Sequence, residues 1–205
     1  MIGIVDYGVG NLFSLESSFA FIGEKAVVLR DKDKLQTADK LILPGVGAFA
    51  DAARKLRDSG MDSIILEEVG KGKPLLGICL GMQLLFEKSY EYGEHEGLGL
   101  IKGSIKPMEP VIGADLKVPH IGWNVLDFPK DKPKSRLFKH VTKGEHVYFV
   151  HSYYGTDCKE NVIAMTEYGT DITAAVAKEN IYGTQFHPEK SGDVGMRILK
   201  AFCEE

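Results

Sequence analysis

The stretch GICLG, residues 77 to 81, places a cysteine between two glycines, after an apolar run and before a helical pattern. This G-x-C-x-G pattern is the cysteine form of the nucleophile elbow, whose glycines permit a sharp, crowded turn from strand to helix. Such a turn holds Cys79 at the carboxyl edge of a sheet, where open α/β sheets bind ligands. A helix N-terminus also favours the thiolate, which is the attacking form of the thiol. The pattern predicts a nucleophilic Cys79, with the backbone N–H of Leu80 as an oxyanion donor.

A cysteine nucleophile needs a base, and the base needs a group that fixes its tautomer. The segment QFHPEKSG supplies His187 and Glu189 directly after an apolar run. Positions i and i+2 of an extended segment face the same way, so we expect the Glu189 carboxylate to orient the imidazole. Alone, this pattern is typical of a proline turn with a surface carboxylate. Joined to Cys79, it predicts a Cys–His–Glu triad.

Two further features are expected beside the elbow. Gln83 lies one helical turn after Cys79 and shares its face, either as a substrate contact or as a solvated helix residue. LPGVGAF (43–49) is a second glycine-rich turn from strand to helix, which a neighbouring parallel strand would bring next to the elbow. A backbone N–H near Gly47 is then the second oxyanion donor, unless this segment is a plain βα turn.

The other two cysteines predict no chemistry. The chain has three cysteines at wide spacings and no C-x-x-C, a pattern that argues against a disulfide framework and against a structural zinc site. We therefore expect Cys158 and Cys203 to be small buried apolar residues. We expect no metal and no cofactor.

Length and composition limit the function classes. A chain of 205 residues favours a single domain over residues 1–205. The net charge of -4 gives no basic field for nucleic acid or anionic lipid. No apolar stretch approaches the ~20 residues of a membrane helix, and the N-terminus does not have the pattern of a signal peptide. We expect a cytoplasmic protein that binds neither nucleic acid nor membrane.

Short apolar strands alternate with helical patterns in the first half of the chain, and the second half is richer in strands. This order predicts an α/β fold with an open mixed, largely parallel sheet, helices on both faces and a strand-rich C-terminal half. We expect a helix over residues 80–90, one strand over 146–155 and a hairpin that turns near Glu179 and Asn180. The basic segment 129–144 is expected to be a solvated loop.

The combination of GICLGMQLLF, PGVGAF and QFHPEKSG resembles the class I (triad) glutamine amidotransferases, and the likeness spans nearly the whole chain. Their fold is flavodoxin-like. Within that family, DYGVGNL, PHIGWN (119–124) and FVHSYY (149–154) are similar to the glutaminase subunits (HisH type) of imidazole glycerol phosphate synthase, an enzyme of histidine biosynthesis. No triad position departs from the family pattern.

The resemblance implies a role for each candidate residue. Cys79 would attack the amide carbon of L-glutamine and form a γ-glutamyl thioester. His187 would protonate the departing ammonia and activate the hydrolytic water, while Glu189 would hold His187. The N–H groups of Gly47 and Leu80 would stabilise the oxyanions. The residues implied to contact the amino-acid end of the substrate are Gln83, Glu91, Ser152 and Tyr153.

The resemblance also implies a partner. A chain of this length is filled by the glutaminase fold, so the synthase that uses the ammonia is expected on another chain. In the family this is a (βα)8-barrel cyclase (HisF type) in a heterodimer. We expect Asn11 and Trp123 at the contact, since aromatic anchors are enriched in interface hot spots. The alternative for Trp123, the only tryptophan, is a place in the core.

Other functions fit parts of the sequence. The opening segment IVDYGVGNLF carries Gly8 and Gly10 after a strand, and Asp31 has a plausible ribose position for a dinucleotide-binding protein. Phe13, however, replaces the third glycine of that motif, where close packing of helix and strand leaves no room for a side chain. A glutaminase serving a different synthase, a related cysteine hydrolase and a non-enzymatic module with a vestigial triad are further alternatives.

Overall fold

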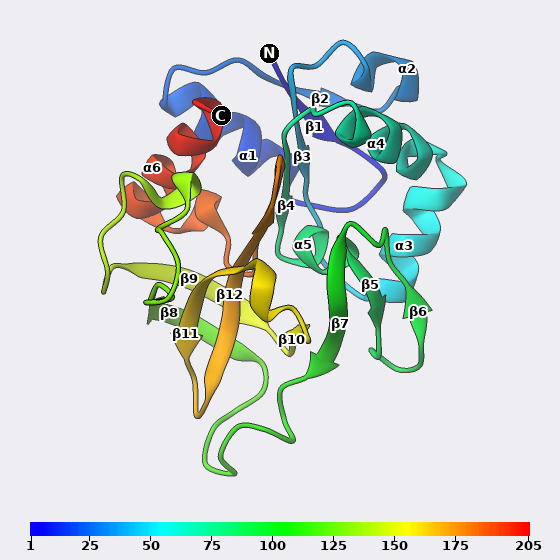
Figure 1. Ribbon diagram of the computed structural model, residues 1–205. Helices are drawn as coiled ribbons and strands as arrows, with labels where there is room; N and C mark the ends of the chain where they lie inside the picture. Colours follow the sequence, from blue (N-terminus) through cyan, green and yellow to red (C-terminus); the bar gives the residue numbers. More distant parts are fainter.

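The computed structural model describes all residues from 1 to 205, and its centre is a seven-stranded sheet (Figure 1). The strands of this sheet are β1 (Ile2–Val5), β2 (Ala26–Leu29), β3 (Lys40–Leu43), β4 (Leu75–Ile78), β11 (Val162–Glu167), β12 (Asp171–Lys178) and β13 (Ile181–Thr184). Their order is β11-β12-β13-β4-β3-β1-β2. Strands β13, β4, β3, β1 and β2 pair in parallel, whereas β11, β12 and β13 pair antiparallel. The predicted mixed, largely parallel sheet is confirmed.

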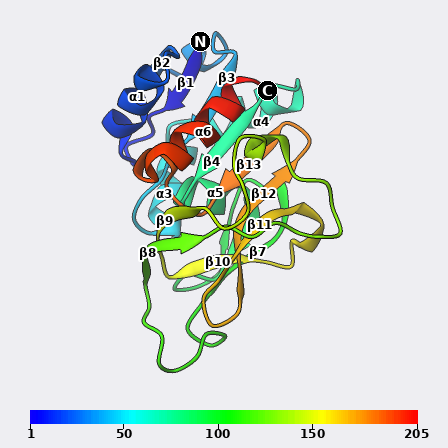
Figure 2. The ribbon, with the colours of Figure 1, turned by 90° about the vertical axis from the view of Figure 1, so that its left-hand side faces the viewer.

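Helices cover both faces of this sheet (Figures 1 and 2). The helices are α1 (Leu12–Phe21), α2 (Lys32–Leu35), α3 (Phe49–Asp58), α4 (Met61–Gly70), α5 (Leu80–Leu84) and α6 (Gly192–Cys203). The strands feed two separate cores because their side chains alternate between the faces. On β4, for example, Leu75 packs in the core with α3 and α4, and Leu76 packs with α1 and α6.

The helix boundaries follow from local chemistry. Helix α3 buries Phe49, Ala52, Ala53 and Leu56, the i, i+3, i+4, i+7 pattern of a helix with one apolar face. Helix α1 is followed by Gly23 at a φ of 80°, the left-handed conformation that often terminates a helix.

Two smaller sheets lie beside the central one. Their strands are β5 (Phe86–Ser89), β6 (His95–Glu96), β7 (Ile101–Pro107) and β10 (Tyr153–Thr156) in one sheet, and β8 (His120–Val125) and β9 (His146–His151) in the other. The helix predicted over 80–90 begins at the correct residue but is too long, because α5 ends at Leu84. Residues 86–89 form β5 instead, which pairs with β6 and β7 and buries Phe86 and Ser89 while Glu87 stays exposed. Tertiary pairing outweighs the helical pattern there.

Two other predictions need correction. The strand expected over 146–155 is interrupted at Ser152, so its two parts, β9 and β10, belong to different sheets. The basic segment 129–144 is not simply a solvated loop, because a short 3-10 helix (Arg136–Phe138) buries Leu137 and Phe138 in the core that contains α6. The predicted hairpin between β12 and β13 is present, with Glu179 in the left-handed conformation.

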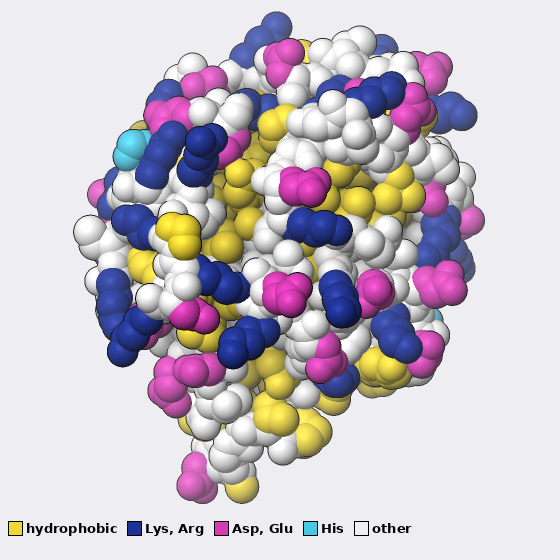
Figure 3. All heavy atoms as spheres, in the orientation of Figure 1, with side chains coloured by type: hydrophobic (Ala, Val, Ile, Leu, Met, Phe, Trp, Pro, Cys, Tyr) yellow, Lys and Arg dark blue, Asp and Glu magenta, His cyan; other side chains and the backbone are white.

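The surface and the remaining cysteines are unremarkable. Basic and acidic side chains are interspersed over the face in Figure 3, so no large field of one sign is seen there. No helix has the length and apolar character needed to cross a membrane.

As predicted, Cys158 is buried, whereas Cys203 is only partly buried. The second 3-10 helix (Lys159–Asn161) follows Cys158 directly.

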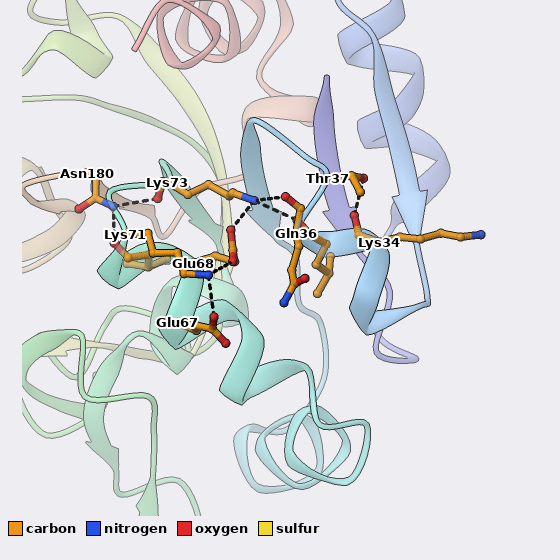
Figure 4. A network of polar contacts seen from close by, with 10 residues as sticks. Lys34, Gln36, Thr37, Glu67, Glu68, Lys71, Lys73 and Asn180 are labelled. Atoms are coloured by element: carbon orange, nitrogen blue, oxygen red, sulfur yellow. Dashed lines mark hydrogen bonds and ion pairs between the residues drawn. The ribbon is translucent and has the colours of Figure 1, made fainter.

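A buried carboxylate holds together the end of the sheet that lies away from the elbow (Figure 4). Glu68 on α4 forms ion pairs with Lys73 Nζ at 2.7 Å and Lys71 Nζ at 2.8 Å. Lys73 Nζ also donates to the backbone carbonyls of Leu35 and Gln36 at the C-terminal end of α2. The side-chain amide of Asn180, in the β12–β13 turn, donates to the Lys73 carbonyl at 2.8 Å. The network joins α2, α4 and this hairpin.

Replacing Lys73 with methionine is expected to destabilise the fold by roughly 2 to 3 kcal/mol, because the change leaves the Glu68 carboxylate without its buried partner. The side chains of Glu68 and Lys73 are 7% and 11% exposed, whereas that of Lys71 is 57% exposed. Lys71→Met is therefore the matched control and is expected to have little effect. Denaturant unfolding of the two variants measures the difference; equal losses would contradict a special role for the buried pair.

Candidate active site

Cys79 stands at a strained turn between β4 and α5. Its backbone φ is 55°, in the left-handed region, which is rare for a residue with a side chain. The turn depends on its two glycines: a Cβ on Gly81 would lie 1.8 Å from the Leu43 carbonyl oxygen, and a Cβ on Gly77 would lie 2.7 Å from that of Gly81. The Cys79 N–H donates to the Thr184 carbonyl at 2.7 Å, which ties the turn to β13. This is the elbow geometry that the sequence predicts.

His187 and Glu189 lie next to this turn because β13 pairs in parallel with β4, with Thr184 opposite Ile78. His187 Nδ1 lies 2.7 Å from Glu189 Oε1, and both side chains are almost completely buried. The other carboxylate oxygen, Glu189 Oε2, has no hydrogen-bond partner. The contact is the one expected, but the reason given for it is wrong: Pro188–Lys190 form a 3-10 helix, so the turn and not an extended strand brings the two side chains together.

The surroundings of His187 favour its protonated form. Burial alone lowers the pKa of this imidazole, but hydrogen bonds and charge interactions with Cys79 and Glu189 outweigh burial and raise its pKa to about 10. Because Glu189 occupies Nδ1, Nε2 is the ring atom available to the Cys79 sulfur. A proton held at Nε2 is well placed for transfer to a leaving group.

A cavity of about 600 Å³ opens in front of Cys79 and His187. The other predicted site residues that line it are Gly47, Leu80, Gln83, Glu91, Ser152 and Tyr153. The turn at 43–49 lies beside the elbow because β3 and β4 are parallel neighbours, as expected. Glu189 does not line the cavity and lies behind His187.

Two of the predicted substrate contacts have defined surroundings. Gln83 is buried, so the alternative of a solvated helix residue is wrong. Its Nε2 donates to the Tyr153 carbonyl at 3.2 Å and to Gln185 Oε1 at 3.1 Å. The Glu91 carboxylate accepts a hydrogen bond from the backbone N–H of Phe49 at the start of α3, which holds it at the cavity wall.

Sequence reasoning missed several residues at this site. His151 lines the cavity, and its Nδ1 lies 2.8 Å from the Tyr153 carbonyl. His120 lies behind it, with Nδ1 3.2 Å from His151 Nε2. Burial lowers the pKa of His151 to about 3 and that of His120 to about 4, so both are neutral. Gln185 was also missed, although its place two residues before His187 was a signal that it belongs to the same site.

The two predicted interface residues lie at the surface. Trp123 is 56% exposed, so the alternative of a core position is wrong, and Ile121 on the same side of β8 is 59% exposed. Trp123 packs edge-to-face on Tyr148, with ring centroids 6.0 Å apart, and the Tyr148 carbonyl accepts from the His187 N–H at 3.0 Å. Asn11 is exposed and accepts from the Ser14 N–H as the N-cap of α1.

Comparison with known proteins decides the family. Residues 4–205 match the model of the family described as glutamine amidotransferase class-I. The chain belongs to the class I glutamine amidotransferases. Two relatives show that this class I amidotransferase is of the HisH type, and both are named imidazole glycerol phosphate synthase subunit HisH. The protein from Sulfurimonas denitrificans is 52% identical, and that from Caldanaerobacter subterraneus subsp. tengcongensis is 49% identical; each alignment covers 100% of this chain and 98% of the relative.

A solved structure supports the fold of this amidotransferase independently. The crystal structure of a glutamine amidotransferase superimposes with a TM-score of 0.76 at 20% sequence identity, covering 99% of this chain and 97% of the other. The dinucleotide-binding alternative fails on the same findings. The packing obstacle expected at Phe13 is not present, because this side chain is 79% exposed on α1 and does not lie between helix and strand.

Proposed function

We propose that this chain is the glutaminase subunit of imidazole glycerol phosphate synthase. It hydrolyses L-glutamine to glutamate and ammonia, and a cyclase subunit uses the ammonia to make imidazole glycerol phosphate and AICAR in histidine biosynthesis. The observation that carries the proposal is that Cys79 and His187 meet at one cavity, with Glu189 held against His187 from behind. The full-length HisH relatives support the choice of synthase.

The chemistry follows from the geometry in two stages. The Cys79 sulfur attacks the side-chain amide carbon of glutamine, and the carbonyl electrons move onto oxygen. When the C–N bond breaks, His187 gives its proton to the departing nitrogen, so that ammonia leaves and a γ-glutamyl thioester remains. Water then adds to the thioester carbon while His187 takes its proton, and the C–S bond breaks to release glutamate and restore the cysteine.

The rest of the site stabilises and positions the substrate. The N–H groups of Gly47 and Leu80, both at the cavity, stabilise the two tetrahedral oxyanions. The amino-acid end of glutamine contacts Gln83, Glu91, Ser152 and Tyr153, which all line the cavity. Glu91 is the group whose charge complements the substrate ammonium.

The partner we propose is the (βα)8-barrel cyclase (HisF type), docked over the mouth of the cavity in a heterodimer. Ammonia in neutral water is mostly ammonium, which is not nucleophilic, so delivery through the partner preserves the reactive form. Trp123 and Asn11 are the proposed contacts. The exposure of Trp123 beside Ile121 supports this assignment, and so does its packing on Tyr148, whose backbone bonds that of His187.

The proposal is tested with amide-labelled glutamine. We expect the complex of this chain with a barrel cyclase and its nucleotide substrate to place mainly labelled nitrogen in the imidazole product, even in excess unlabelled ammonium at moderate pH. The chain without the cyclase is the control and measures glutamine hydrolysis alone. Full isotopic dilution would mean that ammonia mixes with solvent. Hydrolysis without any imidazole product would point to a different synthase.

A further inference from the structure

Gln185 is a fully buried polar residue beside the nucleophile, and the mechanism above gives it no role. It lies between the end of β13 and His187. Its side-chain Nε2 is 3.9 Å from Cys79 Sγ, within the range of a hydrogen bond to sulfur, and its Oε1 is 3.1 Å from Gln83 Nε2. Both side-chain hydrogen bonds of Gln185 are thus with the nucleophile or with a residue that lines the cavity.

The direction of these hydrogen bonds is determined by one backbone group. The Tyr153 carbonyl can only accept, so the end of the Gln83 amide that faces it is the nitrogen. The same nitrogen faces Gln185, so Gln185 turns its oxygen toward Gln83. Its own nitrogen is then left for Cys79 Sγ. The amide of Gln185 therefore presents an N–H to the sulfur without depending on how its two ends are assigned.

The Tyr153 carbonyl is itself held from the other side. His151 Nδ1 carries the proton that it donates to this carbonyl, which leaves His151 Nε2 to accept from His120 Nδ1. Asn124 Nδ2 lies 3.4 Å from His120 Nε2 and donates to the Glu167 carbonyl at 2.8 Å. All donors and acceptors along this path are consistent, so side chains of the paired strands β8 and β9 hold the Tyr153 carbonyl in position.

We propose that Gln185 is a positioning residue for Cys79: its amide, oriented by Gln83 and the Tyr153 carbonyl, donates to Sγ and holds the attacking sulfur in its reactive form. The inference rests on the proposed glutaminase function. A donor beside the sulfur stabilises the thiolate more than the thiol. It also opposes rotation of the side chain away from the cavity, while His187 remains free to transfer protons. Long contacts of this kind tighten when substrate is bound.

The test is the pH dependence of Cys79 alkylation by iodoacetamide, which reports the thiolate and needs no glutamine turnover. Gln185→Met keeps the length of the side chain and removes the donor. We expect the pH midpoint of alkylation to rise by about one unit, with roughly tenfold slower alkylation at neutral pH and a similar loss of kcat. Gln185→Glu, which replaces the donor with a carboxylate, is expected to raise the midpoint further.

The controls separate this role from an effect on substrate binding through Gln83 and from an effect on stability. Cys79→Ala gives the background alkylation of Cys158 and Cys203. Gln36→Met changes the one glutamine outside the site, on the exposed end of α2, and is expected to leave the profile unchanged. A raised KM with an unmoved alkylation profile would mean that Gln185 acts only on Gln83 and would overturn the proposal. So would a lowered thermal midpoint with an unmoved profile. A shifted profile in a chain without glutaminase activity would support the role of Gln185 and count against the proposed function.

Discussion

Replacing Cys79 with alanine is expected to reduce glutamine hydrolysis by at least roughly 10⁴-fold, to the limit of detection, because no other group at the cavity can form the thioester. Alanine fits the space of the thiol and leaves the backbone of the elbow in place. In the complex with a cyclase, synthesis from added ammonium salts is expected to continue, since it bypasses the thioester. Ammonia release from glutamine and product formation from ammonium, measured on the same complex, check the two halves of this result.

The other two cysteines are the matched controls. Cys158 is buried against Thr173, and Cys203 lies on α6, both away from the cavity. Burial raises the pKa of both thiols, that of Cys203 to about 12, so neither is activated. Alanine at either position should leave hydrolysis unchanged. Retained hydrolysis in Cys79→Ala would remove Cys79 from the mechanism.

The second large effect is expected at the base. His187→Ala should lower kcat roughly 10⁵- to 10⁶-fold, since proton transfer to the leaving nitrogen is lost. Glu189→Gln should cost less, roughly 10³- to 10⁴-fold, because a misoriented imidazole still transfers some protons. Steady-state kinetics of the two variants give the ranking. If neither substitution lowered kcat, the segment from His187 to Glu189 would have only a structural role.

The pH dependence of stability gives an independent measurement of the same pair. The pKa of His187 rises from 6.5 to about 10 in the folded state, against the opposing effect of burial. The resulting stabilisation is complete below about pH 6.5 and is lost as the pH rises through about 10. Glu189→Gln removes its share of the rise, so the free energy of unfolding should differ most between wild type and variant at pH 6 and converge toward pH 10. A difference independent of pH would contradict the coupling.

Much of the fold could be predicted because the strand that ends at a glycine-rich turn is a local signal. The G-x-C-x-G turn and the apolar alternation of strands and helices are of this kind. The helix predicted over 80–90 was too long because residues 86–89 form a strand that pairs with a strand later in the chain, and no local pattern records that pairing. The burial of Leu137 and Phe138, within the segment predicted as a solvated loop, likewise depends on packing against α6, which comes later in the chain.

The candidate site was predictable to the extent that its chemistry is carried by short motifs. Cys79 lies within one motif, and His187 and Glu189 lie within another. Gln185, His151 and His120 belong to a hydrogen-bond network that includes the Tyr153 carbonyl, a backbone group with no sequence signature. The 3-10 turn at 188–190 was also invisible, since proline after a histidine fits several conformations. Hydrogen-bond networks that depend on backbone atoms cannot be predicted from short sequence motifs.

The position of β13 between β12 and β4 has a consequence for the nascent chain during synthesis. A ribosome makes the elbow early and the strand that carries the base long afterwards, and domains fold as their segments emerge. Until residues 181–189 have been translated and have entered the middle of the sheet, the Cys79 thiol has neither its imidazole nor the Thr184 carbonyl that fixes its turn. If the proposed triad acts, glutaminase chemistry begins only when the central sheet closes, and an unfinished chain is expected to release no ammonia.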